Sequence, residues 1–371
     1  MANDNNNSNL DTAVYSLWFG LDYGSIITSY ALCRTIEEMG RKPYLMQKLP
    51  ELWTDHYEDK DNIAGKFIYD NCEVLNVFDD PGAKERYDNT LMHVTGSDII
   101  WNAKVVGKQA GCYYFCEAAP ENSTRIAYGS SFGNYFPAVE NALNKHSMLL
   151  HKFKGISVKE SDDVDIMNSI FGIAPEFVID PVFLCDKKCF EDCAEKAPAR
   201  EVEKSSRFIW SYVKNGDKRK KEFSLRGNNI LMEKHTHPLR TFIDINRFPE
   251  SQKALGLEPA YHILVNDWLY YLINSEFVIT DDYYGMCMAL VFEKPFVVMA
   301  QKDMPDLARY VSLLELLRLE ERLVFMTNDF RTKEYLFRKP VRYSKVSGIL
   351  EKLRSDSYNW LKCMMDGSDK K

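Results

Sequence analysis

Apolar residues near the start of the chain first run together and then recur at the spacing of a helix. The run Val14–Phe19 is rich in β-forming residues, and Gly20–Gly24 interrupts it. Across Ser25–Met39, apolar side chains return every three or four residues, and Gly40 is a suitable end for that helix. Pro43–Met46 then reads as a second strand. A strand, a helix and a strand in this order predict a βαβ unit and therefore a parallel sheet.

Four further apolar runs in the first half of the chain read as strands that end in small or polar residues. The predicted strands are Leu91–Thr95, Arg125–Tyr128, Gly155–Val158 and Phe177–Ile179. The residues that follow them are Gly96–Asp98, Gly129–Gly133, Lys159–Glu160 and Asp180–Pro181. Ligands of open α/β sheets bind outside the carboxyl ends of the strands, so we expect the chemistry at these four positions.

A charged stretch separates these elements from a second set. Asp186–Ser206 contains Pro198 and shows no strand pattern, so we interpret it as a helix and a linker at the domain boundary. Beyond it, the pattern predicts strands at Phe208–Val213, Phe277–Ile279 and Pro295–Met299, helices near Asp267–Ile273 and up to Leu319, and a long amphipathic helix at Ser344–Met365.

These patterns predict an α/β protein of two domains. The first spans residues 1–190, of which residues 1–11 are expected to be a disordered tail. The second spans residues 206–342, and a C-terminal helix and tail take up residues 343–371. The polar stretch Lys214–Arg226, with its basic run Lys218–Lys221, is typical of a solvated loop; the alternative is an electrostatic collar for an anionic substrate.

Composition and charge exclude several classes of protein. The 371 residues include 47 Lys and Arg against 54 Asp and Glu, and the net charge of −7 disfavours a nucleic-acid binder that relies on phosphate neutralisation. No apolar stretch approaches the roughly 20 residues that span a bilayer, and the Asn-rich start lacks the basic region of a signal peptide. We therefore expect a cytoplasmic protein without a transmembrane segment, compatible with peripheral attachment to a membrane.

The nine cysteines are odd in number and irregularly spaced, which is not the pattern of a disulfide framework. Cys185, Cys189 and Cys193 lie four residues apart, as do Cys112 and Cys116, so that each set can share a helical face. Metal sites more usually carry Cys-x-x-Cys pairs. We therefore expect free thiols rather than a metal site.

Six blocks, in order along the chain, resemble the polysaccharide pyruvyl transferase family. They are Tyr23–Leu32, Gly96–Asn102, Ile126–Gly133, Ile156–Glu160, Ile179–Leu184, and Trp268–Leu269 with Phe277–Asp281. Gly96–Asn102, for example, is similar to the family's Gly-Ser-Asp-Gln-Val-Trp-Asn, with isoleucine in place of the glutamine. The resemblance extends from about Val14 to about Leu361.

The resemblance implies two Rossmann-like domains facing a cleft, as in GT-B glycosyltransferases, with the acceptor on the first domain and the donor on the second. It implies that an enolpyruvyl unit passes from phosphoenolpyruvate to a sugar hydroxyl as a ketal. Phosphoenolpyruvate would be a co-substrate, and no cofactor or metal is implied. The acceptor would be a saccharide or lipid-linked saccharide of a capsule, exopolysaccharide or cell-wall polymer.

The chain departs from the family's Thr-Asp-Ser-Phe-His-Gly block, because Thr280–Gly285 reads Thr-Asp-Asp-Tyr-Tyr-Gly. Tyr284 stands in place of the histidine, and its reference pKa of about 10 suits a proton donor better than a base. If Tyr284 is the acid, then Asp281 or Asp98 is the base. Asp282, in place of the serine, would repel a donor phosphate at close range.

The remaining residues to which the resemblance points each have a structural alternative. The donor-binding candidates are Lys159, Arg309, Asp282 and Gly285, and the acceptor-binding candidates are Gly24, Ser25, Trp101, Asn102 and Ser130. Gly24 and Ser25 equally suit a turn and helix cap, and Trp101 suits the core better than a platform for a sugar. Lys159 replaces an arginine of the family and equally suits an ion pair with Glu160. His235 and His237 are expected to be ordinary loop residues.

Three functions stay open on the sequence. The leading one is pyruvyl transfer. The first alternative is a GT-B-type glycosyltransferase that uses a nucleotide sugar, although the chain contains no Gly-x-Gly-x-x-Gly fingerprint. The second is a non-catalytic binding or scaffold protein of a polysaccharide assembly system, which the substitution at Tyr284 favours and the retained Gly-Ser-Asp block disfavours.

Overall fold

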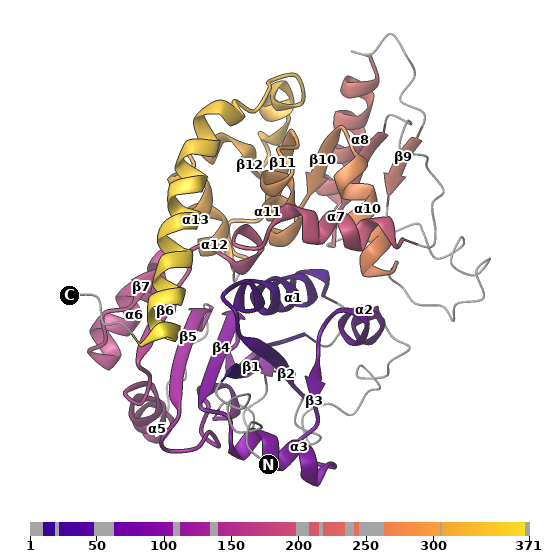
Figure 1. The fold of residues 1–371 in the computed structure, drawn as a ribbon. Coiled ribbons are helices and arrows are strands. Elements are labelled where there is room, and N and C mark those ends of the chain that lie inside the picture. Colours follow the sequence, from indigo (N-terminus) through magenta and orange to yellow (C-terminus); the bar gives the residue numbers. More distant parts are fainter. Residues whose placement is uncertain are drawn as a thin grey trace. The chain divides into compact units, whose positions relative to one another are not determined.

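The chain forms two compact units (Figure 1). The computed structural model describes residues 10–18, 22–47, 63–106, 112–133, 140–197, 208–214, 218–233, 241–244, 263–304 and 306–367. The first unit comprises the chain up to Cys185 together with Lys352–Lys371, and the second comprises Asp186–Glu351. For comparison, the sequence predicts domains over residues 1–190 and 206–342 and sets residues 343–371 apart.

In the described part of the first unit, a parallel sheet has the strand order β3-β2-β1-β4-β5-β6-β7. The strands are β1 (Asp11–Tyr15), β2 (Lys42–Met46), β3 (Val74–Leu75), β4 (Met92–Asp98), β5 (Thr124–Ser130), β6 (Gly155–Val158) and β7 (Glu176–Phe177). Every residue of β1 and β4 is buried, because strands of a parallel sheet are covered on both faces. The predicted parallel sheet is therefore confirmed.

Helices occupy the connections between these strands (Figure 1). They are α1 (Tyr23–Glu38), α2 (Ile63–Asn71), α3 (Pro81–Asp88), α4 (Ala103–Val106), α5 (Glu140–Leu150) and α6 (Ser161–Phe171), with the 3₁₀ helices η3 (Tyr113–Phe115) and η4 (Pro181–Phe183). The Asp22 side chain caps α1 by accepting a hydrogen bond from Gly24 N at 2.8 Å. Gly40 follows the end of α1 with a φ of +81°, a conformation that favours glycine.

Several strand predictions in this unit differ from the structure in their extent. The first strand, predicted at Val14–Phe19, is β1 at Asp11–Tyr15, so it begins with a buried residue of the stretch 1–11 that the sequence analysis assigns to a disordered tail. The predicted strand Leu91–Thr95 continues to Asp98, because the Gly-Ser-Asp block pairs with β5 up to the partners Asp98 and Ser130. Of the predicted strand Phe177–Ile179, only Phe177 belongs to β7. At Ile179 the backbone N–H donates to Ser357 Oγ at 3.1 Å, so a side chain from the C-terminal helix takes the place of a strand partner.

The second unit is built on a parallel sheet of order β12-β11-β10-β8-β9 among the described residues. Its strands are β8 (Phe208–Tyr212), β9 (Thr241–Asp244), β10 (Phe277–Thr280), β11 (Phe296–Ala300) and β12 (Leu323–Phe325). Its helices are α7 (Lys187–Glu195), α8 (Lys218–Glu233), α10 (Val265–Asn274), α11 (Tyr283–Val291) and α12 (Leu307–Leu316), with the 3₁₀ helices η6 (Glu320–Arg322) and η7 (Phe330–Phe337).

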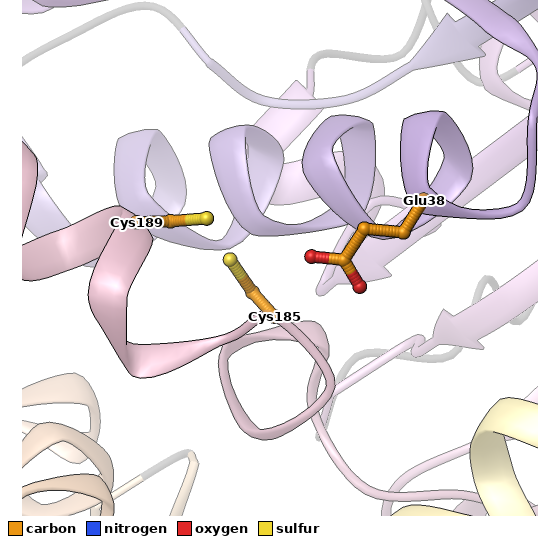
Figure 2. Close-up of side chains that lie close together, drawn as sticks. All are labelled: Glu38, Cys185 and Cys189. Atoms are coloured by element: carbon orange, nitrogen blue, oxygen red, sulfur yellow. The ribbon is translucent and has the colours of Figure 1, made fainter.

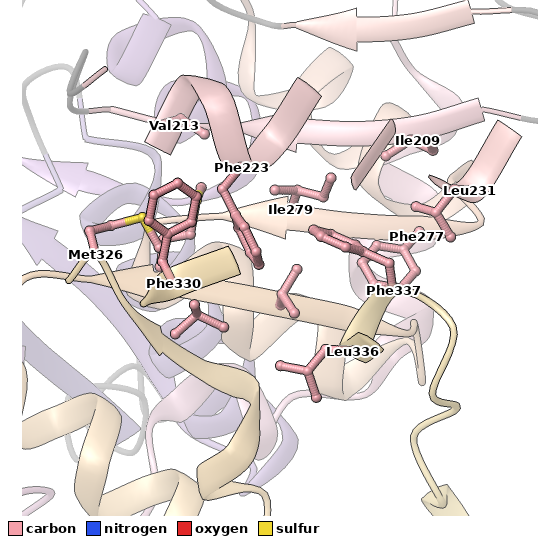
Figure 3. Packing of buried hydrophobic residues seen from close by; sticks show 13 residues of the cluster. Ile209, Val213, Phe223, Leu231, Phe277, Ile279, Met326, Phe330, Leu336 and Phe337 are labelled. Atoms are coloured by element: carbon pink, nitrogen blue, oxygen red, sulfur yellow. The ribbon is translucent and has the colours of Figure 1, made fainter. Parts of the chain in front are cut away.

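The prediction that Lys214–Arg226 is a solvated loop is wrong for Lys218–Arg226, which belongs to α8. Phe223 and Leu231 of α8 are buried in the apolar cluster of Figure 3, which also takes in Phe277, Phe330 and Phe337. Within the cluster, the ring centroids of Phe223 and Phe337 lie 4.9 Å apart. α8 is therefore an amphipathic helix: a few apolar residues on one face pack into the core, while most of its other residues are basic or polar.

The predicted C-terminal helix is confirmed as α13 (Tyr343–Asp366), and the division between the two units falls within it. In its C-terminal part, Arg354 donates to the carbonyl of Leu184 at 3.1 Å, and the carbonyl of Met364 accepts from Lys154 Nζ at 3.1 Å. This part of α13 is therefore bonded into the first unit. Over the residues that the structure describes, no helix is both long enough and apolar enough to cross a membrane.

Candidate functional site

In each sheet of described strands, there is one switch point, at which the chain changes from adding strands on one side to adding them on the other. In the first unit this switch point lies between β1 and β4, and in the second unit it lies between β8 and β10. Helices leave the sheet on opposite sides of a switch point, so the strand ends there are the usual ligand sites of open α/β sheets. Asp98 ends β4 at the first switch point, and Asp281 follows β10 at the second.

Asp98 is held in an unusual backbone conformation at the end of β4. Its φ is +80°, in the region that non-glycine residues rarely adopt. Its carbonyl accepts hydrogen bonds from Ile100 N at 2.7 Å and from Ser131 N at 3.0 Å. The turn therefore fixes the Asp98 side chain relative to the ends of both β4 and β5.

The Asp98 carboxylate belongs to a buried charged cluster that we call the Lys159 cluster: Lys159, Asp98, Asp180 and Thr28. Lys159 Nζ lies 2.7 Å from Asp180 Oδ2 and 3.4 Å from Asp98 Oδ1. Thr28 on α1 donates to Asp180 Oδ1 at 2.8 Å. The Lys159 side chain is 1% exposed, and that of Asp180 is fully buried. The sequence points to Lys159 and Asp98, but their partners Asp180 and Thr28 were missed as site residues, although Asp180 follows a predicted strand.

The turn Gly24–Ser25 opens α1 next to the first switch point. Asp22 already caps this helix start, and the carbonyl of Ser25 accepts from Ser29 Oγ at 2.6 Å. Ser29 Oγ in turn lies 2.5 Å from the hydroxyl of Ser16, which follows β1. The turn that is predicted to bind the acceptor thus lies beside the end of β1. The helix that it opens already has the Asp22 carboxylate at its N-terminus.

The other predicted acceptor residues are buried in the first unit. Trp101 is 1% exposed, and its ring stacks on Phe115 with centroids 5.2 Å apart. Its Nε1 donates to the carbonyl of Tyr114 at 3.2 Å. Ser130 Oγ donates to the carbonyl of Thr95 at 3.1 Å, and Asn102 is 8% exposed. In this conformation the structure gives Trp101 and Ser130 contacts typical of a core.

A second buried group of carboxyls lies one strand away and was not singled out from the sequence. Glu160 follows β6, and Asp163 lies in the first turn of α6. The Ser131 hydroxyl donates to Glu160 Oε2 at 3.0 Å and accepts from Gly133 N at 2.8 Å. It also contacts the Asp163 carboxyl, whose Oδ1 accepts from the backbone N–H of Phe132 at 3.4 Å. Burial, with Glu160 as a second cause, raises the pKa of Asp163 to about 8.

This carboxyl pair makes stability depend on pH. Asp163 keeps its proton in the folded chain up to about pH 8, whereas the unfolded chain loses it near pH 4, so the free energy of unfolding should fall as pH rises between these values. We expect a loss of a few kcal/mol over this range. Asp163→Asn should remove this slope in urea unfolding measured at several pH values.

The matched control for this prediction is Asp165→Asn, which changes an exposed aspartate of the same helix. Asp165→Asn should leave the pH profile as it is. Glu160, Asp162, the Ser131 hydroxyl and the backbone N–H of Phe132 are the groups that act on Asp163 from its own and the neighbouring elements. An unchanged slope in Asp163→Asn would show that Asp163 is not the group whose pKa is raised in the folded chain.

At the switch point of the second unit, two aspartates after β10 meet two lysines that follow β8. Asp281 Oδ2 lies 2.6 Å from Lys220 Nζ, and its Oδ1 accepts from Lys214 N at 2.7 Å. Asp282 Oδ1 lies 2.5 Å from Lys214 Nζ, while its Oδ2 accepts from Gly285 N at 2.7 Å and caps α11. Lys220 comes from the basic run Lys218–Lys221, and it is 5% exposed rather than solvated.

Tyrosines and an arginine surround this charged network. Tyr283 and Tyr284 begin α11, are each 2% exposed, and meet edge to face with centroids 5.2 Å apart. Arg309 of α12 pairs with Asp306 and lies over the Tyr283 ring at 4.8 Å. Tyr310 donates its hydroxyl proton to the carbonyl of Asp281 at 3.1 Å, and burial raises the pKa of Tyr310.

The structure describes the cysteines that the sequence analysis singles out, but not its two histidines. In the first unit, the Cys185 thiol and the Glu38 carboxylate come within 4.8 Å of each other; Figure 2 shows both, together with Cys189 of α7. The nine cysteines are free thiols. His235 and His237 lie outside the described residues.

Solved structures share the fold of this chain. The UDP-GlcNAc 2-epimerase from Neisseria meningitidis, bound to UDP-GlcNAc, matches with a TM-score of 0.55 and 14% identity over 96% of this chain and 100% of that chain. A putative UDP-N-acetylglucosamine 2-epimerase from Listeria monocytogenes matches with a TM-score of 0.52 and 10% identity over 98% of both chains. These likenesses confirm the predicted GT-B-like α/β fold class.

Among curated protein sequences, none matches the chain significantly. The model of a protein family described as polysaccharide pyruvyl transferase matches residues 22–303, well over half of the chain. That span includes β4 with Asp98, the Lys159 cluster and the Thr280–Gly285 block. The chain therefore belongs to the polysaccharide pyruvyl transferase family.

Proposed function

We propose that this protein transfers the pyruvyl unit of phosphoenolpyruvate to the hydroxyls of a saccharide as a ketal. The observation that carries the proposal is the position of Thr280–Gly285, a block that lies within the span matched by the family, at the switch point of the second sheet. Three cationic side chains lie there: Lys214 and Lys220 pair with Asp282 and Asp281, and Arg309 lies over the ring of Tyr283. A strand end with nearby cations suits a donor that carries both a phosphate and a carboxylate.

The reaction moves protons and one phosphate and changes no oxidation state overall. The methylene carbon of phosphoenolpyruvate gains one proton and becomes a methyl group. Two sugar hydroxyls form bonds to the neighbouring carbon, whose bond to the phosphate oxygen breaks. They release two protons, of which one balances the methyl group and one leaves with the phosphate. The enzyme must therefore supply an acid, a base and a site for the anions, and phosphoenolpyruvate enters as a co-substrate.

Within the second unit, Tyr284 is the proposed acid, because a tyrosine hydroxyl stays protonated at neutral pH. It lies in the first turn of α11, two residues after the buried Asp282. Asp281 and, in the first unit, Asp98 are the candidate bases. Each is oriented by a buried lysine, Lys220 in one case and Lys159 in the other.

The proposed acceptor is a saccharide, free or linked to a lipid. The turn Gly24–Ser25, beside the switch point of the first sheet, is its proposed binding site, with the Ser16 and Ser29 hydroxyls nearby. Hydroxyl groups at such a strand end can donate to and accept from sugar hydroxyls. A carbohydrate acceptor agrees with the membership of the family.

The test is to incubate the purified chain with phosphoenolpyruvate and a panel of saccharides, and to follow phosphate release together with the new methyl signal by NMR. Tyr284→Phe should lower the rate of phosphate release by about 10²-fold or more, because it removes the proton donor. Tyr335→Phe is the control, since Tyr335 lies in η7 and is 46% exposed. That variant should react at the wild-type rate.

Two results would contradict the proposal. Turnover in Tyr284→Phe equal to that of the wild type would remove Tyr284 from the mechanism. Release of nucleotide from a nucleotide sugar, with phosphoenolpyruvate left intact, would assign the chain to glycosyl transfer instead.

A further inference from the structure

The three cations at the β8–β10 switch point differ in how firmly they are held. The Lys220 side chain is 6% exposed and bonded to Asp281, and that of Arg309 is 11% exposed, paired with Asp306 and packed on Tyr283. The Lys214 side chain is 37% exposed. Lys214 is therefore the cation of this group that a dissolved anion meets first.

The backbone of Lys214 is fixed while its side chain can change partners. The Lys214 N–H donates to Asp281 Oδ1 at 2.7 Å, which holds the start of the side chain at the strand end. The ammonium group sits on a flexible four-carbon stem and forms no rigid two-pronged contact, unlike a guanidinium group. Its ion pair with Asp282 Oδ1, at 2.5 Å, can therefore break by side-chain rotation alone.

Asp282 occupies the place where an incoming anion would be most stable. Its side chain is 3% exposed, and Oδ2 accepts from Gly285 N at the start of α11. The N-terminus of a helix attracts negative charge, and here a carboxylate of the chain itself satisfies it. The same carboxylate also neutralises Lys214, so it opposes a second anion in two ways.

We propose that Lys214 leaves Asp282 to bind the phosphate group of the donor, so that Asp282 competes with the donor for this lysine and sets the donor's affinity. The inference rests on the proposed function, which assigns phosphoenolpyruvate as the donor. In chemical terms, the lysine exchanges one anion, the Asp282 carboxylate, for another, a phosphate monoester or free phosphate. Lys214 is thus a donor-binding residue, and Asp282 determines how tightly a phosphate donor binds.

The test measures the dissociation constant of phosphoenolpyruvate by calorimetry at one fixed, low ionic strength. Asp282→Asn keeps a side chain that can cap α11 and removes the competing charge, so binding should become about tenfold tighter. Lys214→Met keeps the apolar stem, and binding should become about tenfold weaker or more. In the double variant, Asp282→Asn should give a clearly smaller gain over Lys214→Met than it gives in the wild type, because only its direct repulsion of the anion is then removed.

The matched controls come from Lys188 and Asp192, an exposed lysine–aspartate pair on α7 with a distance of 2.9 Å. Lys188→Met and Asp192→Asn make the same charge changes and should leave the dissociation constant within a factor of two. An equal gain from Asp282→Asn with and without Lys214 would overturn the inference. Unchanged binding in Lys214→Met would do the same.

Inorganic phosphate as a second probe separates this inference from the proposed function. If phosphate binding depends on Lys214 and Asp282 as described while no pyruvyl transfer occurs with any acceptor, the inference holds and the proposed function fails. If pyruvyl transfer occurs and Lys214→Met leaves the binding of phosphoenolpyruvate unchanged, the function holds and the inference fails. Absence of binding by both probes, in the wild type and in Asp282→Asn, would overturn both.

Discussion

Replacing Gly96 with alanine is expected to unfold the first unit. A Cβ atom on Gly96 would lie 2.1 Å from the carbonyl oxygen of Tyr128, and the φ of +135° is one that other residues rarely adopt. Because Tyr128 belongs to β5, the strand that pairs with β4 over this stretch, its carbonyl cannot move aside without breaking the sheet. We expect a loss of more than about 4 kcal/mol, at the extreme of single substitutions.

The measurement is thermal unfolding together with hydrogen exchange of the amides of β4 and β5. Gly172→Ala is the matched control, since Gly172 has a φ of +66° but no atom within 4 Å of an added Cβ. It should cost roughly 1–2 kcal/mol, the cost of the left-handed conformation alone. Equal melting temperatures of Gly96→Ala and Gly172→Ala would contradict the close approach of β4 and β5 at Gly96.

Lys159→Met is expected to lower the free energy of unfolding by about 3–5 kcal/mol. The substitution leaves Asp98 and Asp180 buried without the cation that lies between them. In a unit of this size the loss corresponds to a fall in Tm of roughly 10 °C. Thermal unfolding of the two chains in the same buffer measures it.

A second variant tests whether the buried charge is the cause. Lys159→Met with Asp180→Asn removes one negative charge along with the positive one, and it should recover part of the lost stability. Lys188→Met removes an exposed lysine that pairs with Asp192, and it should change stability by less than about 1 kcal/mol. A double variant that is less stable than Lys159→Met alone would mean that packing, and not charge, explains the effect.

The sequence predicted the strands better than the contacts at their ends. Apolar runs such as Gly155–Val158 and Phe277–Ile279 became β6 and β10 almost unchanged, because local composition decides whether a segment is a buried strand. Asp98 and Lys159 were chosen from motifs, and the structure brings them together. Nothing in the sequence marks Asp180 as their partner, since sequence spacing does not show which strand ends are neighbours in the sheet.

Polar segments were harder to predict, for a related reason. The basic start of α8 reads as a loop because charged residues dominate it, yet Phe223 anchors the helix and Lys220 finds a buried carboxylate at Asp281. Burial of a lysine depends on a counter-charge supplied by another segment, here one that lies 61 residues further along the chain. Glu160 and Asp163 are hard to predict as a pair for a similar reason, because their shared partner Ser131 follows a different strand.

The position of α13 has a consequence for the order in which the protein is made. Ser357 bonds to the backbone at Ile179, and Trp360 and Met364 pack where a Cβ on Gly155 would lie, so residues that follow the second unit in the chain complete the unit that precedes it. Domains usually fold one after another as they emerge during synthesis. Here the first sheet must wait, with this surface uncovered, until translation has passed through the whole of the second unit. A stop codon near residue 351 would therefore damage the N-terminal unit more than the C-terminal one.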